Sequence, residues 1–298
     1  MKLFRFYDPE RGAQLGVQPE GDDRIYNISD RFVMISAWLR ASVGDVSDAI
    51  EELEALARIS RVSLNCADLE SPPMPDTAHW LAPVDQQDVW AAGVTYEPSR
   101  SARQDEGASG ADAYSRGYNA VRPYLFYKAH GSRVIGHRGF VGIRGDSVRS
   151  VPEPELAVLL NPALEVVGLT IANDMTSRDI ESANPLYLAQ AKIYMGSCAL
   201  GPGILLHPAA RWPDTNIQMR VLRGDVEIFS GETHTGRIRR SLTELIEYVG
   251  RSSRHPDGVV LLTGTGVVPP ENFTLQEDDE VQITIGGIGT LSNTVKVV

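Results

Sequence analysis

Two apolar stretches of strand length, separated by a short turn, constrain the fold of this chain most strongly. Residues 155–160 (ELAVLL) and 165–172 (EVVGLTIA) flank Asn161–Leu164. Short apolar runs bounded by residues that favour turns are typical of β-strands. The pattern therefore predicts a β-hairpin in the middle of the chain.

Helical periodicity is concentrated in the first part of the sequence. Apolar residues recur at helical spacing in 31–40 and 45–59, among short strand-like runs. Prolines crowd 71–76 and cannot continue a helix or a central strand. We therefore predict a small N-terminal α+β domain at 1–75 and a mainly β domain at 76–298 that carries the chemistry. The fold class is α+β.

Two local patterns predict further elements in the second domain. The runs NIQMRVL and VEIFS flank Arg223–Asp225, which predicts a second hairpin. Ser241, followed by Glu244, matches a capping box and predicts a helix that ends near Val249.

The composition limits the classes of partner. The chain has 298 residues, with 28 basic and 39 acidic side chains and a formal net charge of −11. This balance argues against nucleic acid and against an anionic membrane surface as the main partner. No apolar run is long enough to span a bilayer, the N-terminus lacks a leader pattern, and the 2 cysteines are too few for a disulfide framework. We expect a cytoplasmic protein.

Two carboxylates at the start of the first apolar strand carry the strongest chemical signal. Glu153 and Glu155 lie two apart in an extended Pro-Glu-Pro-Glu segment, so their side chains point to the same face. Like charges side by side repel each other unless a cation lies between them. The predicted hairpin returns Asp174 to the same end of the sheet. Three carboxylates without Cys or His suit a hard divalent cation, which can be Mg²⁺, Mn²⁺ or Ca²⁺. An exposed acidic turn with a capping aspartate is the other interpretation.

Two further motifs are open to two interpretations each. Lys192 lies in a stretch that is otherwise uncharged, in a chain with only four lysines. A partly buried cation needs an anionic partner, either a substrate carboxylate or, as the sequence alone favours, a structural salt bridge. Gly264 and Thr265 follow an apolar strand and offer backbone N–H groups and a hydroxyl to a ligand, or form an ordinary turn.

A long polar segment follows the strand-like run that ends near Tyr96. Its length and composition predict a lid over residues 99–120. Tyr96, Glu97 and Arg100 open this segment. We assign Tyr96 and Arg100 to substrate binding, since Arg100 can meet an acid.

Together these motifs resemble the fumarylacetoacetate hydrolase superfamily. The resemblance covers about residues 90–298 and implies a mixed β-roll catalytic domain behind a smaller N-terminal domain, usually in a homodimer or homotetramer. The matching motifs are WAAGVTYEPSR, VRPYLFYKA, VPEPELAVLL, IANDMTSRDIESANPLYLAQAKIYMGSCALGP and LLTGTGVVPP.

The resemblance also implies roles for the residues singled out above. It implies that Glu153, Glu155 and Asp174 are the ligands of Mg²⁺. It places Lys192 opposite the 2-oxo acid end of a small-molecule substrate. It implies that Thr265, next to Gly264, grips the carboxylate of that substrate.

Within the superfamily, the forms GVTYEPSR, NPLYL and GSCALGP resemble the branch that dehydrates 2-keto-3-deoxy sugar acids of the 2-keto-3-deoxy-D-arabinonate type. Two positions depart from known patterns. Ser99 stands where C–C hydrolases of the superfamily have the His of a water-activating dyad. Tyr124 stands where the dehydratase branch has a glutamate, and a tyrosine is a poor base at neutral pH.

The resemblance therefore implies a metal-dependent hydro-lyase that releases a dioxo acid and water. Glu97, Glu106 or a metal-bound water is the candidate base, and Tyr124 is the candidate acid. Hydrolysis or decarboxylation of 2,4-dioxo acids, acylpyruvates or oxaloacetate uses the same chelate and is the alternative. A third hypothesis is a protein that binds an oxo acid without turnover.

Overall fold

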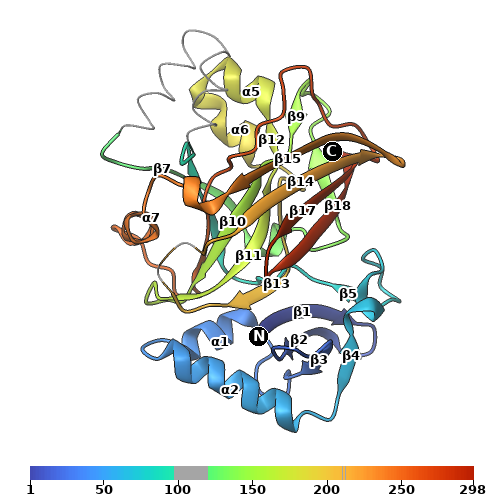
Figure 1. Cartoon of the computed structure of the whole chain (residues 1–298), viewed down its shortest axis with the longest axis vertical. Coiled ribbons are helices and arrows are strands. Elements are labelled where there is room, and N and C mark those ends of the chain that lie inside the picture. The colour runs from blue at the N-terminus through green and yellow to red at the C-terminus, as the bar shows by residue number, and fades with distance from the viewer. Residues whose placement is uncertain (97–119, 210, 212) are drawn as a thin grey trace.

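The computed structural model describes residues 1–96, 120–209, 211 and 213–298. Two β-sheets, one of 11 and one of 5 strands, form the body of the molecule (Figure 1). In spatial order, the strands of the large sheet are β4 (Ser63–Asn65), β3 (Arg24–Asn27), β2 (Gly12–Gln18), β1 (Lys2–Asp8), β13 (Cys198–Leu206), β11 (Val166–Asp174), β10 (Pro154–Leu160), β16 (Val259–Leu262), β6 (Asp88–Gly93) and β7 (Tyr124–His130), with β5 (His79–Trp80) paired to β1.

The smaller sheet comes mainly from the C-terminal part of the chain. In spatial order, its strands are β15 (Val226–His234), β14 (Asn216–Arg223), β17 (Glu280–Ile285), β18 (Gly289–Val297) and β8 (Phe140–Ile143). A separate pair consists of β9 (Ser150–Val151) and β12 (Thr176–Ser177). The α-helices of the described residues are α1 (Ile35–Ala41), α2 (Val46–Ile59), α5 (Arg178–Ala183), α6 (Leu188–Lys192) and α7 (Leu242–Gly250), and the 3₁₀ turns are η1 (Cys66–Leu69), η2 (Gly131–Arg133), η3 (Pro185–Tyr187) and η4 (Thr235–Arg237).

The central hairpin predicted from the two apolar runs is confirmed. Strands β10 and β11 pair antiparallel, with Pro154 opposite Asn173. The Asn161 side chain closes the turn, because its Oδ1 accepts hydrogen bonds from the backbone N–H groups of Ala163 and Glu165, each at 3.0 Å. Every residue of both strands is buried, which explains why these strands are apolar on both faces.

Each face of the central strands packs against a different layer. Leu156 and Val158 point into the core between the two sheets. Ala157 and Leu159, on the opposite face, belong to the core that also contains Trp38 of α1 and Leu53 of α2. Because side chains alternate along a strand, Glu153 and Glu155 lie on the same face as Ala157. The acidic pair therefore extends from the helix-covered face of the large sheet.

The N-terminal strands continue the large sheet. Strand β1 pairs antiparallel with β13, with Leu3 opposite Ile204. The two helices expected at 31–40 and 45–59 are present as α1 and α2, and Figure 1 shows them beside β1–β3 at the lower end of the molecule, far from α5 and α6. The boundary at residue 75 stays a prediction, but the two parts share hydrogen bonds and a core.

The hairpin and the helix predicted for the C-terminal part are confirmed, whereas only the Ser241 half of the predicted capping box is present, since the Glu244 side chain pairs with Arg240. Strands β14 and β15 form the second hairpin. The Ser241 side chain caps α7, accepting a hydrogen bond from the Glu244 backbone N–H at 3.1 Å. The α+β fold class is confirmed. Among the described residues, no helix combines the length and apolar character needed to cross a bilayer.

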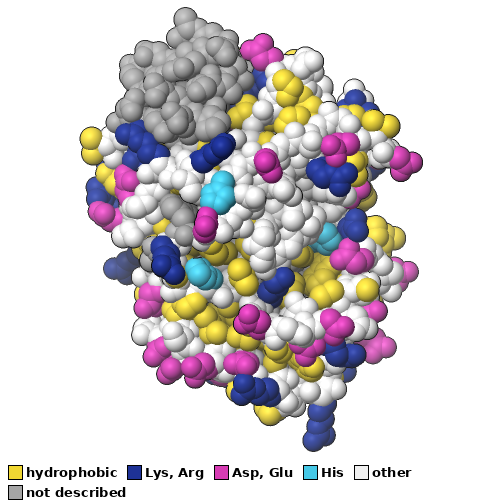
Figure 2. All heavy atoms as spheres, in the orientation of Figure 1, with side chains coloured by type: hydrophobic (Ala, Val, Ile, Leu, Met, Phe, Trp, Pro, Cys, Tyr) yellow, Lys and Arg dark blue, Asp and Glu magenta, His cyan; other side chains and the backbone are white. Residues whose placement is uncertain are grey.

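Charges of both signs are mixed on the face of the molecule shown in Figure 2. Lys and Arg side chains alternate there with Asp and Glu side chains. This face therefore presents no large area of a single sign. The concentrated charge in the described residues is instead buried, beside the start of β10.

The shared core predicts that the N-terminal strands and the β-rich body unfold together. Leu3 is fully buried at the β1–β13 junction, so Leu3→Ala should lower the free energy of unfolding by about 2–5 kcal/mol. Urea denaturation followed by tryptophan fluorescence and by circular dichroism should show one shared transition in both proteins. Two separate transitions, only one of which shifts in the variant, would contradict this expectation.

Candidate active site

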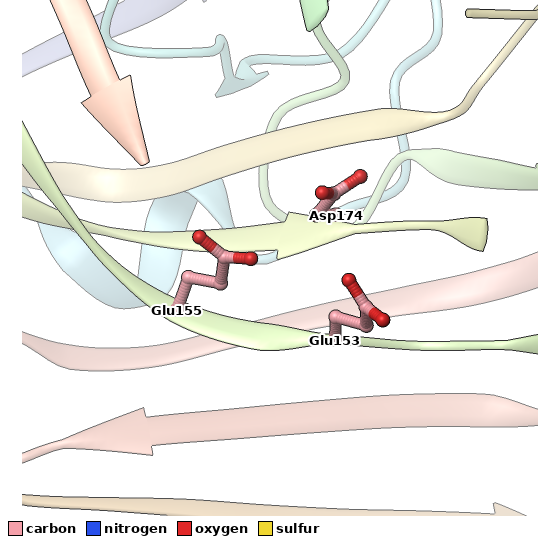
Figure 3. A group of neighbouring side chains, drawn as sticks. All are labelled: Glu153, Glu155 and Asp174. Carbon is pink, nitrogen blue, oxygen red and sulfur yellow. The ribbon is translucent and has the colours of Figure 1, made fainter. Parts of the chain in front are cut away.

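Three buried carboxylates meet where the central hairpin opens (Figure 3). Glu153, Glu155 and Asp174 are 3%, 2% and 1% exposed, and each offers an oxygen within 4.8 Å of the others. The hairpin backbone sets this arrangement, because the Asp174 N–H donates to the Glu153 carbonyl at 3.0 Å. The predicted return of Asp174 to the glutamate pair is confirmed.

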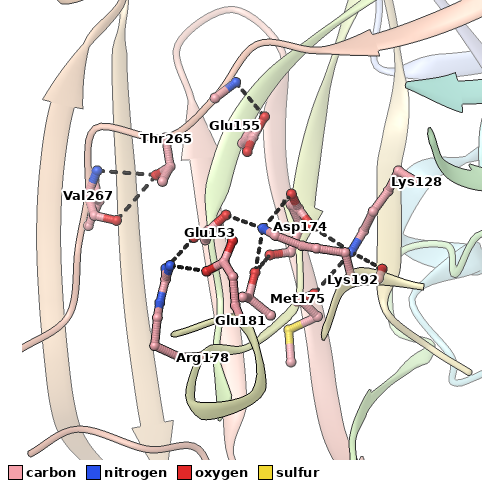
Figure 4. A network of polar contacts seen from close by, with 12 residues as sticks. Lys128, Glu153, Glu155, Asp174, Met175, Arg178, Glu181, Lys192, Thr265 and Val267 are labelled. Carbon is pink, nitrogen blue, oxygen red and sulfur yellow. Dashed lines mark hydrogen bonds and ion pairs between the residues drawn. The ribbon is translucent and has the colours of Figure 1, made fainter. Parts of the chain in front are cut away.

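Lys192, at the end of α6, points its ammonium group into this acidic cluster (Figure 4). Its Nζ donates to Glu153 Oε2 at 2.7 Å, to Asp174 Oδ2 at 2.9 Å and to Thr176 Oγ1 at 2.6 Å. Burial lowers the pKa of Lys192, but the negative charges of Asp174 and Glu153 outweigh it and hold the pKa above its ordinary value. The salt bridge that the sequence alone favoured is present, and Lys192 also lines the cavity described below.

A second lysine, which the sequence analysis did not assign, fixes Asp174 from the other side. Lys128 of β7 is fully buried, and its Nζ lies 2.5 Å from Asp174 Oδ1. It also donates to the backbone carbonyls of Met175 at 3.0 Å and of Lys192 at 2.6 Å. Lys128 therefore ties β7 to the end of β11 and to the end of α6. Its position in an apolar strand of a lysine-poor chain was the available signal.

Arg178 and Glu181 of α5 also belong to the buried charge cluster, and neither was predicted from the sequence. Arg178 is 2% exposed and forms an ion pair with Glu153 through one nitrogen. Through the other nitrogen it contacts Glu181 Oε2 at 2.5 Å. The two residues lie one helical turn apart, which was a local signal for an ion pair but not for a place in the site.

Glu155 is the carboxylate of this cluster without a cationic partner among the described residues. Gly264 follows the end of β16, the strand paired with β10, and its backbone N–H donates to Glu155 Oε2 at 2.6 Å. Gly264 has a φ of +86°, and a Cβ there would lie 2.1 Å from Thr95 Oγ1, so only glycine fits. Burial, followed by the charges of Asp174 and Glu153, raises the pKa of Glu155 well above its ordinary value.

The donor set fits a divalent cation. The described part of the cluster has one more carboxylate than it has cations, and the uncompensated carboxylate belongs to the three-oxygen group. A hard cation ligated by oxygens would relieve the repulsion that raises the pKa of Glu155. The carboxylates are Glu153, Glu155, Asp174 and Glu181, and the cations are Lys128, Arg178 and Lys192.

A narrow cavity of about 20 Å³ opens beside the carboxylates. Aromatic rings form part of its wall: Tyr124 and Phe126 of β7 lie 5.6 Å apart, and Lys192 Nζ lies 5.5 Å from the Phe126 ring centre. Gly93 allows the Tyr124 ring to lie close to the strand, since a Cβ at Gly93 would be 2.4 Å from that ring. The cavity thus combines a cation, carboxylates and an apolar wall.

The other residues assigned from the sequence fall in different places. Tyr124, Gly264 and Thr265 line the cavity. The Thr265 hydroxyl also contacts the backbone of Val267 at 3.2 Å. Tyr96 is fully buried and is not among the described residues that line the cavity. Its role in substrate binding stays a prediction.

Several assigned residues lie outside the described residues. They are Glu97, Ser99, Arg100 and Glu106, together with the lid expected at 99–120 apart from Ala120. The Ala120 carbonyl accepts a hydrogen bond from Arg240 at 2.6 Å. The roles expected for Glu97 and Arg100 remain predictions.

With this geometry established, comparisons with known proteins decide the family. The profile named Fumarylacetoacetate (FAA) hydrolase C-terminal matches residues 89–296. The chain belongs to the fumarylacetoacetate hydrolase family. All the described residues of the buried charge cluster lie within residues 89–296, the part of the chain that matches the family.

Relatives within the fumarylacetoacetate hydrolase family include named dehydratases. A probable 2-keto-3-deoxyxylonate dehydratase of Haloferax volcanii is 43% identical over 83% of this chain and 88% of its own length. A 2-dehydro-3-deoxy-D-arabinonate dehydratase of Saccharolobus solfataricus is 40% identical over 72% of this chain and 73% of its own. The solved structure of a 2-keto-3-deoxy-D-arabinonate dehydratase complexed with magnesium and 2,5-dioxopentanoate is 33% identical, with a TM-score of 0.83 over 100% of this chain and 99% of that one.

The raised pKa of Glu155 predicts that proton release accompanies Mg²⁺ binding. Below that pKa the metal-free carboxyl holds a proton that Mg²⁺ must displace, so Mg²⁺ affinity should rise with pH, by up to about tenfold per pH unit for one proton. Calorimetric titration in buffers of different ionisation enthalpy measures the protons released. A binding heat that is independent of the buffer, together with an affinity that does not change with pH, would contradict this.

Proposed function

We propose that this chain is a Mg²⁺-dependent dehydratase that converts a 2-keto-3-deoxypentonate of the arabinonate or xylonate type into 2,5-dioxopentanoate and water. The observation that carries the proposal is the buried group of Glu153, Glu155 and Asp174, in a chain that is 40% or more identical to two dehydratases. The magnesium and the 2,5-dioxopentanoate in a related structure support the same chemistry.

The three carboxylates are the proposed metal ligands. Their oxygens converge within 4.8 Å. Together with Glu181, the described cluster has four carboxylates against the three cations Lys128, Arg178 and Lys192, so it is one positive charge short of neutral. Bound Mg²⁺ supplies a Lewis acid that polarises the 2-oxo group and makes the C3–H more acidic. Mn²⁺ and Ca²⁺ are alternatives that the same oxygens accept.

Residues around the cluster bind and orient the substrate. The Lys192 ammonium, already held at the cavity by Glu153 and Asp174, stabilises negative charge that develops on the 2-oxo group. The Thr265 hydroxyl lies on the cavity wall and binds the substrate carboxylate. The Gly264 N–H serves Glu155 instead, so its role is to orient a metal ligand.

Tyr124 is the proposed donor of a proton to the departing C4 hydroxyl. Its ring lines the cavity, and it is 37% exposed. A phenol stays protonated at neutral pH, which suits an acid and not a base. This assignment gives a role to Tyr124, the departure from the pattern that the sequence predicted for the dehydratase branch.

The assembly and the location of the chain stay predictions. We retain the expectation of a homodimer or homotetramer and of a cytoplasmic protein. Neither expectation affects the chemistry proposed for the site.

The function is tested by incubating the Mg²⁺-loaded protein with 2-keto-3-deoxy-D-arabinonate, 2-keto-3-deoxy-D-xylonate or acetylpyruvate and following products by NMR. We expect 2,5-dioxopentanoate from at least one of the pentonates and no pyruvate from acetylpyruvate. Glu153→Gln should abolish turnover, because it removes a ligand and a partner of Lys192. Glu232→Gln, at an exposed position on β15, is the matched control and should leave turnover unchanged.

Two results would contradict the proposal. Pyruvate from acetylpyruvate, without any product from the pentonates, would assign the chain to C–C bond cleavage. Dehydration at the wild-type rate by Glu153→Gln, or by metal-free protein, would show that the reaction does not depend on the carboxylate group.

A further inference from the structure

One buried carboxylate lines the cavity without belonging to the three-oxygen metal group. Glu181 is 7% exposed and contributes to the cavity wall together with Lys192 and Tyr124. The three residues that converge for a metal are Glu153, Glu155 and Asp174, and Glu181 is not one of them. Among the described residues, Glu181 is therefore the carboxylate that can face the substrate without first binding the metal.

The surroundings of Glu181 hold it in one orientation. It lies on α5, and its Oε2 contacts an Arg178 nitrogen at 2.5 Å. Arg178 is itself anchored, since its other nitrogen pairs with Glu153. A chain of contacts thus fixes the Glu181 carboxylate relative to a proposed metal ligand (Figure 4). A base held in this way needs little reorganisation when a substrate arrives.

We propose that Glu181 is the catalytic base that removes the C3 proton of the 2-oxo acid, an inference that rests on the proposed function. Glu181 takes the proton while the C3–H electron pair forms the C3–C4 double bond. The C4–O bond breaks, and the hydroxyl leaves as water with the proton of Tyr124.

The same groups complete the reaction and return to their starting states. The Tyr124 phenolate takes a proton from C5, and Glu181 returns its proton to C3. The C5 enol then passes its hydroxyl proton to C4 through solvent, which leaves the aldehyde of 2,5-dioxopentanoate. No oxidant, reductant or further co-reactant is needed.

The competing interpretation is that Glu181 only neutralises Arg178. Glu181→Gln distinguishes the role of catalytic base from the role of partner to Arg178. A glutamine oxygen still accepts a hydrogen bond from Arg178 but does not act as a base. Glu181→Asp keeps the carboxylate on a shorter side chain. Asp179→Asn is the matched control, because Asp179 lies on the same helix but accepts hydrogen bonds from Ser147 and Val148.

The test follows exchange of the C3 protons of 2-oxobutanoate with D₂O by NMR, at saturating Mg²⁺ and 2-oxobutanoate. This probe has no C4 hydroxyl, so it isolates proton transfer at C3 from dehydration. We expect Glu181→Gln to slow exchange by about 10²–10⁴-fold. Glu181→Asp should restore part of the rate, and Asp179→Asn should exchange like the wild type. Mg²⁺ binding and the thermal midpoint are measured for each variant.

The possible outcomes distinguish a catalytic base from a residue that only neutralises Arg178. Loss of exchange in Glu181→Gln, with Mg²⁺ binding and the fold retained, supports the inference. Exchange at the wild-type rate in this variant overturns it, as does a wild-type protein that exchanges no protons. Loss of exchange together with loss of Mg²⁺ binding in both Glu181 variants assigns Glu181 to neutralising Arg178. Exchange that depends on Glu181, in a protein that dehydrates neither pentonate, upholds the base and refutes only the proposed function.

Discussion

Compensation of buried charge is the constraint on which the site depends. Carboxylates with almost no exposure are costly unless cations or a metal accompany them. Lys128 and Lys192 approach Asp174 from two sides, and Arg178 pairs with Glu153, so each cation lies beside a carboxylate of the cluster. Glu155 has no such partner among the described residues, and its pKa is raised by burial and by its acidic neighbours. Among the described residues the cluster is one positive charge short, and this deficit favours a metal site over a salt-bridge network alone.

The central hairpin turns this electrostatic arrangement into a defined geometry. Strands β10 and β11 are buried on both faces, and the close packing of each face, together with the Asn161 turn, fixes their register. That register brings Asp174 beside Glu153, and the pairing of β10 with β16 brings the Gly264 N–H within hydrogen-bond distance of the Glu155 carboxylate. The second sheet packs against one face of the hairpin, and helices α1 and α2 pack against the other. This packing holds the hairpin in place.

The predictable parts of this protein were those encoded over short distances. The period of two placed Glu153 and Glu155 on one face, and the short turn returned Asp174 to them. The Ser241 cap was equally local. In contrast, Lys128 reaches Asp174 from a strand far away in the sequence, so no spacing rule finds it. The pairing of β1 with β13 was hidden for the same reason, because cross-strand register between distant segments is fixed by tertiary packing.

The proposed chemistry requires that the three buried carboxylates bind a divalent cation. Anomalous diffraction from crystals soaked in Mn²⁺ tests it directly. We expect one strong peak for each chain, within coordination distance of an oxygen from each of Glu153, Glu155 and Asp174. Absence of a peak at this position at saturating Mn²⁺, with the Lys192 ammonium still bonded to both Glu153 and Asp174, would contradict it.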